Sequence, residues 1–367
     1  MNSLSDVIRE HASRYPLMQP CDAVKLVYQS EFGGGHLISH PSDSMERLER
    51  EYQAVLQTHT ASPSPYIESI GGGISRVHLG GWQHSLSLLN RLFVCSASQT
   101  QGSGDRFAQK LQLLASLAEE GIFCFSPKEL EEYLAQYRAA GCPAVSHSPI
   151  YRAAYHPAYR IVEERYLPLL PALAQMERLL RQKNAINVAI DGCAAAGKTT
   201  AAQLISQLFH CTIVHMDDFF LPPSLRTPAR LEEPGGNIHY ERFEQQVVPG
   251  LISRQAFSYP PYCCATGAYL PQRDCPAAEI TLVEGCYSLH PRWSEVFDYK
   301  LFLEIDPELQ TQRILARNGK DMLQRFVELW IPLENQYFSA FHIPQSCDIV
   351  LNLPGTIPLG MSSLHEK

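Results

Sequence analysis

The amino-acid sequence predicts an α/β fold with a doubly wound parallel sheet in its second half, preceded by a mainly α-helical first half. Before about residue 183, apolar residues recur at three- and four-residue spacing, the pattern of amphipathic helices. After it, short apolar runs alternate with helical segments, which is typical of a parallel sheet with crossover helices. At the start of the second half, one such run leads into a glycine-containing loop and then a helix-forming segment.

Composition limits the class of protein. The length of 367 residues suggests two or three domains, and 45% hydrophobic residues are enough for a sizeable core in each. A formal net charge of −8 argues against a nucleic-acid partner, because phosphate-backbone binding needs a basic face. The 11 cysteines show neither C-x-x-C pairs nor metal-ligand spacing, which favours a reduced protein. Without a signal-peptide pattern or a run of about 20 apolar residues, we expect a cytoplasmic location and no membrane contact.

The first half, residues 1–183, is expected to form a mainly helical domain of unknown function. Its helical segments are residues 21–28, 45–56, 107–117, 130–137 and 168–183. Two glycine triplets, Gly33 to Gly35 and Gly71 to Gly73, lack the Lys-Ser/Thr of a phosphate loop and do not fit a dinucleotide fingerprint. Flexible turns between helices are the favoured interpretation. The alternative is a second ligand site near His36, His78, His147 and His156.

The second half, residues 184–367, is expected to contain the sheet. Apolar runs at residues 186–190, 213–216, 280–283, 299–305 and 348–351 are the strand candidates, and residues 242–254, 307–317 and 321–341 are the helix candidates. In such a sheet, ligands bind at the carboxyl ends of the strands. Residues that directly follow a strand are therefore the functional candidates.

One loop carries the clearest chemical signal. It reads Asp191-Gly192-Cys193-Ala194-Ala195-Ala196-Gly197-Lys198-Thr199-Thr200. Its glycines permit a turn in which backbone N–H groups converge on a phosphate, and the dipole of the following helix favours the same anion. Lys198 would reach the β- and γ-phosphates, and the Thr199 hydroxyl would complete the coordination of Mg²⁺. We expect ATP, with Mg²⁺, to bind Gly192, Ala194, Ala195, Ala196, Gly197, Lys198, Thr199 and Thr200.

Acidic residues follow two other strands. Asp217 and Asp218 come directly after residues 213–216, and Glu284 comes directly after residues 280–283. Beside a phosphate loop, carboxylates can hold Mg²⁺ or accept the proton of an attacking hydroxyl. Taken alone, Asp218 reads as a turn cap and Glu284 as an ordinary loop residue. In combination with the loop, the functional interpretation is favoured.

The phosphate loop, the Asp-Asp-Phe-Phe block at residues 217–220 and the Leu-Val-Glu-Gly block at residues 282–285 resemble the uridine kinase and nicotinamide riboside kinase branch of the P-loop kinases. The Asp-Asp-Phe-Phe block is the most discriminating of the three. The resemblance implies an ATP-dependent phosphotransferase with an alcohol group as acceptor. It implies Asp217 as general base or substrate-hydroxyl anchor, and Thr199 with Glu284 as magnesium partners. The charge of Lys198 would offset charge on the transferring group, which makes Lys198 a catalytic candidate as well.

Further matches extend the resemblance over nearly the whole second half. Asp306, Arg313 and Arg317 resemble the start of the family's arginine-bearing lid, which implies that the two arginines bind the nucleotide. Their four-residue spacing places them on one helix face, although a solvated basic face has the same pattern. The segments at residues 330–334 and 347–350 resemble the last helix and strand of the family.

The acceptor pocket is where the sequence departs from this family. The acceptor-binding residues that the resemblance implies are Asp217, His239 and Tyr262. His239 stands where uridine kinases have an aspartate, and a cysteine follows Tyr262 where they have an acidic residue. These departures put uridine and cytidine in doubt as substrates. Arg226 and Arg230 are candidates for recognising an acceptor that bears its own negative charge, with solvated surface arginines as the alternative.

The leading hypothesis is therefore a kinase that transfers the γ-phosphoryl group of ATP to a hydroxyl of a small nucleoside-like molecule. Two alternatives stay open. One is a regulatory nucleotide-binding switch module, in which ATP controls the helical domain. The other is a bifunctional enzyme with a second activity in the first domain. The acceptor, the use of ATP or GTP, and the formation of a homo-oligomer are left open by the sequence.

Overall fold

The computed structural model describes residues 3–35, 38, 41–58 and 65–354 of the chain. Contacts divide the chain into two compact units, Met1–Leu167 and Pro168–Lys367. Helix α8 (Leu170–Gln182) thereby belongs to the second unit, whereas the sequence placed the division after it, near Lys183. His36, one of the four histidines singled out above, lies outside the described residues.

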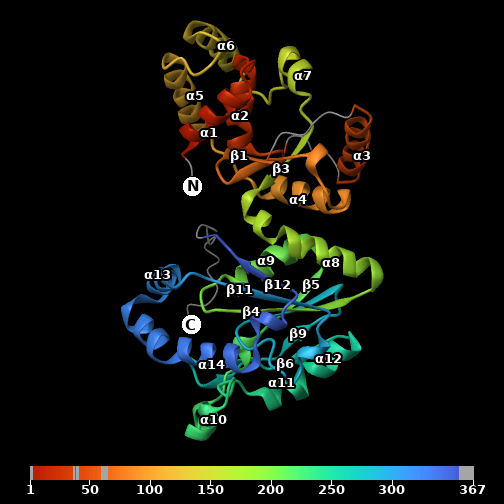
Figure 1. Cartoon of the computed structure of the whole chain (residues 1–367), viewed down its shortest axis with the longest axis vertical. Helices are drawn as coiled ribbons and strands as arrows, with labels where there is room; N and C mark the ends of the chain where they lie inside the picture. Colours follow the sequence, from red (N-terminus) through yellow and green to blue (C-terminus); the bar gives the residue numbers. More distant parts are fainter. Residues whose placement is uncertain (1–2, 36–37, 39–40, 59–64, 355–367) are drawn as a thin grey trace. The chain divides into compact units, whose positions relative to one another are not determined.

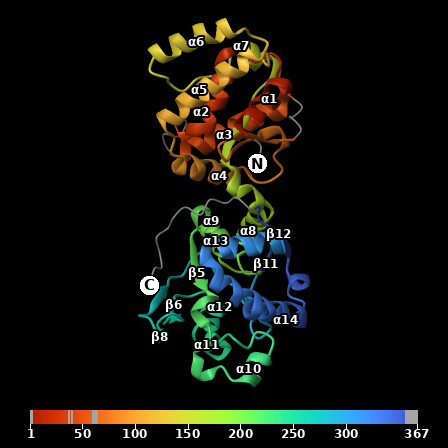
Figure 2. The same ribbon diagram turned by 90° about the vertical axis from the view of Figure 1, so that its left-hand side faces the viewer.

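The N-terminal unit is mainly helical, as the sequence predicts. Serine side chains accept a hydrogen bond from a first-turn N–H at several helix starts, for example Ser3 at α1 and Ser126 at α6. Helices α2, α5 and α6 pack against one another (Figures 1 and 2). The helices are α1 (Leu4–Arg14), α2 (Pro20–Phe32), α3 (Pro41–Thr58), α4 (Leu86–Gln99), α5 (Gly104–Glu119), α6 (Pro127–Ala139) and α7 (Pro149–Tyr155).

The same unit contains an antiparallel sheet that the sequence analysis did not predict. Its strands are β1 (Ile67–Gly71), β2 (Ile74–His78) and β3 (Tyr159–Glu163), in the order β1-β2-β3. No alternation of apolar and polar residues is visible here, because β2 is buried along its whole length and still contains Ser75, Arg76 and His78. Gly71 to Gly73 forms the turn of the β1–β2 hairpin, so the expected turn between helices is wrong at this triplet. A Cβ on Gly72 would lie 2.3 Å from the carbonyl oxygen of Ser30, which explains the need for glycine.

The C-terminal unit is built on a five-stranded parallel sheet in the order β12-β11-β4-β10-β5. Its strands are β4 (Ile186–Gly192), β5 (Cys211–His215), β10 (Ile280–Glu284), β11 (Tyr299–Glu304) and β12 (Ile349–Asn352). All five correspond to predicted strands. β4 is central and buried along its whole length, which explains its continuous apolar run.

Helices cover both faces of this sheet. In Figure 1, α8 and α9 (Lys198–Leu208) lie on one side of the sheet, and α11 (Tyr240–Gln246), α12 (Val248–Ser253) and α14 (Ile331–Phe341) lie on the other. On the second side, Phe243, Leu251 and Phe338 belong to the same buried cluster as Val283 and Phe302 of the strands. Burial of each such side chain contributes roughly 1.5–3 kcal/mol. The α/β fold with a doubly wound parallel sheet is therefore confirmed.

The remaining elements of this unit are short, except for one long interrupted helix. α13 (Pro307–Arg325) spans the gap between the two helices predicted at residues 307–317 and 321–341, but its backbone is non-helical at Gly319, where φ is +79°. The short elements are α10 (Pro228–Glu232), β6 (Phe257–Tyr259), β7 (Tyr262–Cys263), β8 (Ala268–Tyr269) and β9 (Arg273–Cys275). Over the described ranges, no helix is both long enough and apolar enough to span a lipid bilayer.

The strand order fixes where loops from different strands meet. The chain runs from β4 through α9 toward β5 on one side, and β11 and β12 lie on the other side of β4. The carboxyl end of β4 is thus the point at which the strand order reverses, where ligands bind in open α/β sheets. Residues after β4, β5 and β10 come together there.

We predict that Gly192→Ala destabilises the C-terminal unit by about 2 kcal/mol or more. A Cβ at Gly192, where φ is +138°, would lie 2.2 Å from the carbonyl oxygen of Leu303 on β11. Urea unfolding measures the change. Gly104→Ala is the control, because a Cβ there meets nothing within 4 Å, and it is expected to stay within about 1 kcal/mol of the unmodified protein. Equal stability of both variants would contradict the close approach of the two strands.

Candidate active site at the carboxyl ends of the central strands

The predicted phosphate loop connects β4 to α9. Two glycines with positive φ, Gly192 (+138°) and Gly197 (+100°), allow the chain to turn back on itself, and Ala195 adopts a left-handed conformation between them (+59°). Gly197 directly precedes Lys198, the first residue of α9. The structure thus has the strand, loop and helix in the order that the sequence predicts.

Lys198 lies against its own loop. Its Nζ donates to the carbonyl oxygens of Gly192 at 2.8 Å and Cys193 at 2.9 Å. Burial acts to lower the pKa of Lys198, but nearby negative groups, Glu334 first among them, outweigh it and hold the pKa above its ordinary value. The ammonium group therefore stays charged at neutral pH.

A carboxylate already occupies one donor of the loop. The backbone N–H of Ala194 donates to Oε2 of Glu334, a buried side chain on α14, at 2.9 Å. Burial raises the pKa of Glu334 to about 7, against the opposing effect of Lys198. Because this loop N–H already donates to an anionic group of the chain itself, the loop fits the phosphate group that the sequence predicts for it.

Thr199 and Glu284 meet at the edge of the loop. The Thr199 hydroxyl lies 3.1 Å from each carboxylate oxygen of Glu284, which is 4% exposed at the end of β10. A hydroxyl and a carboxylate form the oxygen-donor set that Mg²⁺ prefers when phosphates and water complete its coordination. Within the described ranges, no group of three or more His, Cys, Asp or Glu side chains is placed to hold a metal ion. The two side chains therefore fit a magnesium ion that shares its coordination with a phosphate.

Glu284 also contacts His215, the last residue of β5. His215 Nδ1 lies 2.5 Å from Oε1 of Glu284. Burial acts to lower the pKa of His215, but its hydrogen bond to Glu284 and the charge of that carboxylate raise it overall. The imidazole thus orients the carboxylate that faces Thr199.

The two aspartates after β5 have different surroundings. Asp217 is exposed, although partial removal from water and the charge of Glu284 raise its pKa, while Lys198 acts in the opposite direction. Asp218 accepts hydrogen bonds from the Tyr259 hydroxyl at 2.9 Å and from Arg273 Nη1 at 2.5 Å. Asp218 is therefore tied to the strands β6 and β9, and Asp217 is the carboxylate that is open to a ligand.

The two predicted lid arginines are placed differently. Arg313 Nη1 donates to the carbonyl oxygen of Ala195 in the loop at 3.0 Å. Its Nη2 donates to the carbonyl oxygens of Leu353 and Pro354, at 3.3 and 3.1 Å. Arg317 is exposed and donates to its neighbour Asn318. The structure thus brings Arg313 to the loop and does not bring Arg317 there.

The predicted acceptor-binding residues lie on segments that contact the short 3₁₀ helix η4 (Met216–Phe219), which contains Asp217. The backbone N–H of His239 donates to the carbonyl oxygen of Phe219 at 2.7 Å. Strand β7, which contains Tyr262, also packs against η4. The side chains of both residues have other neighbours: His239 Nδ1 lies 3.2 Å from Glu241, and the buried Tyr262 ring packs edge-on against Tyr269.

Arg226 and Arg230 also separate into different roles. Arg230 donates to both carboxylate oxygens of Glu241, at 2.8 and 3.0 Å, and to two backbone carbonyls, so it braces its own loop. Arg226 donates to the carbonyl oxygen of Leu221 and hydrogen-bonds Cys264, whose thiol is also influenced by the charge of Asp217. Of the two arginines, Arg226 is the one near the predicted acceptor side.

Sequence reasoning missed four side chains that shape this site: Asp191, His215, Gln310 and Glu334. Asp191 is fully buried and accepts four hydrogen bonds, and Gln310 Nε2 donates to the carbonyl oxygen of Ala194 at 2.9 Å. A signal was present for Glu334, because it is a charged residue that directly follows the apolar segment at residues 330–333. Gln310 lies on an otherwise polar helix and gave no signal.

We predict that Glu334→Gln removes a pH-dependent loss of stability. The folded-state pKa of about 7 lies above the ordinary value of 4.5, so ionised Glu334 destabilises the folded state. The stability that protonated Glu334 contributes is fully present below about pH 4.5 and is lost as the pH rises through about 7. Between pH 5 and 8 the free energy of unfolding changes by on the order of 2 kcal/mol. Urea unfolding at the two pH values is the measurement, and the exposed Glu328→Gln is the control. A stability difference between Glu334→Gln and the unmodified protein that does not change with pH would refute the raised pKa.

Comparisons with known proteins add a likeness of fold. No family model matches the chain, and no match is found among curated proteins. Among solved structures, a possible uridine kinase from Bacillus stearothermophilus is similar, with a TM-score of 0.37 and 20% identity over 49% of this chain and 98% of that chain. A candidate fructose transport system kinase from Silicibacter sp. TM1040 is similar with a TM-score of 0.38 and 20% identity, over 46% of this chain and 93% of that chain. The likeness concerns about half of the chain at low identity.

Proposed function

We propose that this protein is an ATP- and Mg²⁺-dependent kinase that phosphorylates a hydroxyl group of a small nucleoside-like acceptor. The observation that carries the proposal is the convergence of Lys198, Glu284 and Asp217 after three adjacent parallel strands, β4, β10 and β5. A phosphate-binding cation, a magnesium-type carboxylate and a free carboxylate are the groups that phosphoryl transfer to an alcohol requires. All of them belong to the C-terminal unit.

The loop residues bind and orient the phosphates in this proposal. The backbone N–H groups from Ala194 to Thr200 and the Lys198 ammonium would hold the anionic oxygens, and Arg313 lies beside the same loop through Ala195. Thr199 and Glu284 would hold Mg²⁺, which when bound neutralises phosphate charge. Lys198 must then exchange its contacts with Gly192 and Cys193 for contacts with phosphate.

Asp217 orients the acceptor hydroxyl and accepts its proton. Its raised pKa makes it a stronger base than an ordinary aspartate, and its exposure leaves it accessible to a hydroxyl group. Phosphoryl transfer has a loose transition state, so the base needs to take up the proton only late. His239 and Tyr262, on segments packed against η4, would form the wall of the acceptor site.

We predict that Lys198→Ala abolishes acceptor-dependent ADP formation, because the main side-chain cation at the loop is lost. The assay measures ATP consumption with Mg²⁺ against a panel of nucleosides, other ribosides, pantothenate and sugar phosphates. Lys320→Ala, on an exposed part of α13, is the control and should retain activity. Acceptor-dependent turnover that survives in Lys198→Ala would refute the assignment of the loop, and tight ATP binding without turnover on any acceptor would favour the switch module.

We also predict that Asp217→Asn lowers turnover by about 100-fold or more and leaves ATP affinity unchanged. The amide keeps the shape of the side chain but cannot accept the proton. Turnover is measured with the acceptor found in the panel, and ATP affinity is measured by calorimetry. The exposed Asp274→Asn serves as the matched control. Normal turnover of Asp217→Asn would mean that another group accepts the proton.

A further inference from the structure

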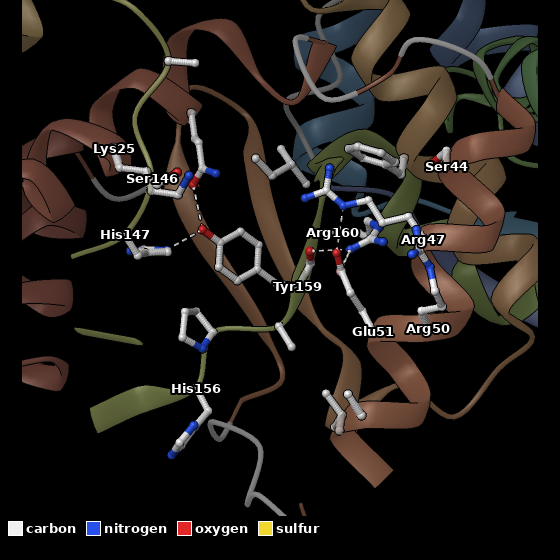
Figure 3. A pocket seen from close by; sticks show the side chains of 18 of the residues that line it. Lys25, Ser44, Arg47, Arg50, Glu51, Ser146, His147, His156, Tyr159 and Arg160 are labelled. Atoms are coloured by element: carbon white, nitrogen blue, oxygen red, sulfur yellow. Dashed lines mark hydrogen bonds and ion pairs between the residues drawn. The ribbon is translucent and has the colours of Figure 1, made fainter. Parts of the chain in front are cut away.

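A cavity of about 710 Å³ lies within the N-terminal unit, which the kinase proposal does not use. Its volume falls in the range of small-molecule sites. Figure 3 shows that Lys25, Ser146 and His147 lie on one side, that Arg47, Arg50 and Glu51 of α3 lie on the other, and that Tyr159 and Arg160 of β3 lie between them. The cavity is therefore walled by separate segments that the fold brings together: α2, α3, the residues before α7, and β3.

The charged side chains that line this cavity are mostly cationic. Four of them are positive, Lys25, Arg47, Arg50 and Arg160, and two are negative, Asp43 and Glu51. The chain as a whole has a net charge of −8, so the excess of positive side chains around this cavity is opposite in sign to the net charge of the chain. Such a concentration of cations around a concave surface attracts anions.

Arg160 gives the most specific indication. The residue is 94% buried, and its Nη1 donates to Glu51 at 2.6 Å and to the carbonyl oxygen of Tyr159 at 3.2 Å. Its Nε is buried without a hydrogen-bond partner among the described residues. Glu51 is itself shared, because it accepts from Arg47 Nε at 2.9 Å. Two guanidinium groups thus share one half-exposed carboxylate, and a buried donor of Arg160 stays unsatisfied, which is unfavourable.

Lys25 adds a second cation that is partly removed from water. Its Nζ donates to the carbonyl oxygen of Val145 at 2.8 Å. Burial lowers its pKa to about 8, and the charge of the buried Arg76 acts in the same direction. Arg76 itself is held by Gln29 Oε1, at 2.8 and 3.1 Å, and by the face of Tyr159. An anion in the cavity would relieve the repulsion between these two cations.

The wall between the cations is fixed by a chain of buried polar groups. His147 Nδ1 lies 2.9 Å from Asp22, and its Nε2 lies 2.7 Å from the Tyr159 hydroxyl. Burial lowers the pKa of His147 to about 4, so the ring is neutral and its Nδ1–H donates to Asp22. His156, which also lines the cavity, has a left-handed backbone with φ of +44°. This residue ends α7, and its backbone N–H donates to the carbonyl oxygen of Arg152.

We propose that this cavity is a second binding site, which takes a small molecule through a phosphate or carboxylate group held by Arg160, Arg47 and Lys25. The anion accepts hydrogen bonds from guanidinium groups that otherwise share Glu51, and it accepts one from the unpartnered Nε of Arg160. Two of the four histidines that the sequence analysis grouped, His147 and His156, line this site, and a third, His78, packs edge-on against Tyr159. The site does not depend on the phosphate loop.

Calorimetry on the full chain tests the proposal, with Lys198→Ala present throughout to weaken binding at the loop. The probes are ribose 5-phosphate, citrate and uncharged ribose. We expect at least one anionic probe to bind at millimolar concentration or below and ribose not to bind. Preference for ribose 5-phosphate would identify a phosphate ligand, and preference for citrate would identify a carboxylate ligand.

Variants then locate the binding. Arg160→Gln should lower the affinity for the probe at least tenfold. Arg138→Gln, a change at an exposed position on α6, should leave the affinity unchanged. Because Arg160 is buried, Arg47→Gln is a second variant at an exposed position, and melting curves establish that each protein is folded. The proposal is overturned if neither anionic probe binds. It is also overturned if the folded Arg47→Gln and Arg160→Gln proteins bind the probe as tightly as the protein without these changes.

Discussion

The carboxylate of Asp191 holds the proposed active site together. It is fully buried at the end of β4 and accepts hydrogen bonds from the N–H groups of Gly192, Tyr287 and Leu289 and from the Tyr337 hydroxyl, at 2.7 to 3.2 Å. These donors belong to the phosphate loop, the loop after β10, and α14. Burial raises the pKa of Asp191, with the backbone N–H groups acting against it. The position of three segments thus depends on one carboxylate that has exchanged its water for four protein donors.

The same region shows why α14 matters to the loop. Tyr337 reaches Asp191 from this helix, and Glu334, one turn earlier, reaches the N–H of Ala194. The spacing of three residues puts both side chains on one face. A rigid strand end and a helix therefore hold the loop from two sides, and Gln310 and Arg313 of α13 hold its carbonyl groups. A loop of small residues, which has little conformational preference of its own, acquires its shape from these four contacts.

The sequence predicted the elements whose signal is local. The apolar run of β4, the loop glycines and the carboxylates after β5 and β10 lie at fixed distances along the chain, so their arrangement followed from strand and loop rules. Contacts between distant segments were not predictable. Glu334 is 140 residues from Ala194, and Arg160 is 109 residues from Glu51. The sheet of the N-terminal unit was missed because buried Arg76 and His78 hide the pattern of β2, and their burial is explained only by Gln29, Tyr159 and Glu68.

The hydrogen bond between Ala194 and Glu334 links anion binding to proton uptake. Any anion that reaches this N–H must displace a carboxylate whose pKa is already about 7, and the added negative charge raises that pKa further. Near neutral pH, binding therefore takes up a fraction of a proton from the buffer. The observed heat of binding then depends on the ionisation enthalpy of that buffer, and the affinity increases as the solution becomes more acidic. An anion bound at this loop would thus be coupled to acidity through a side chain of a different segment.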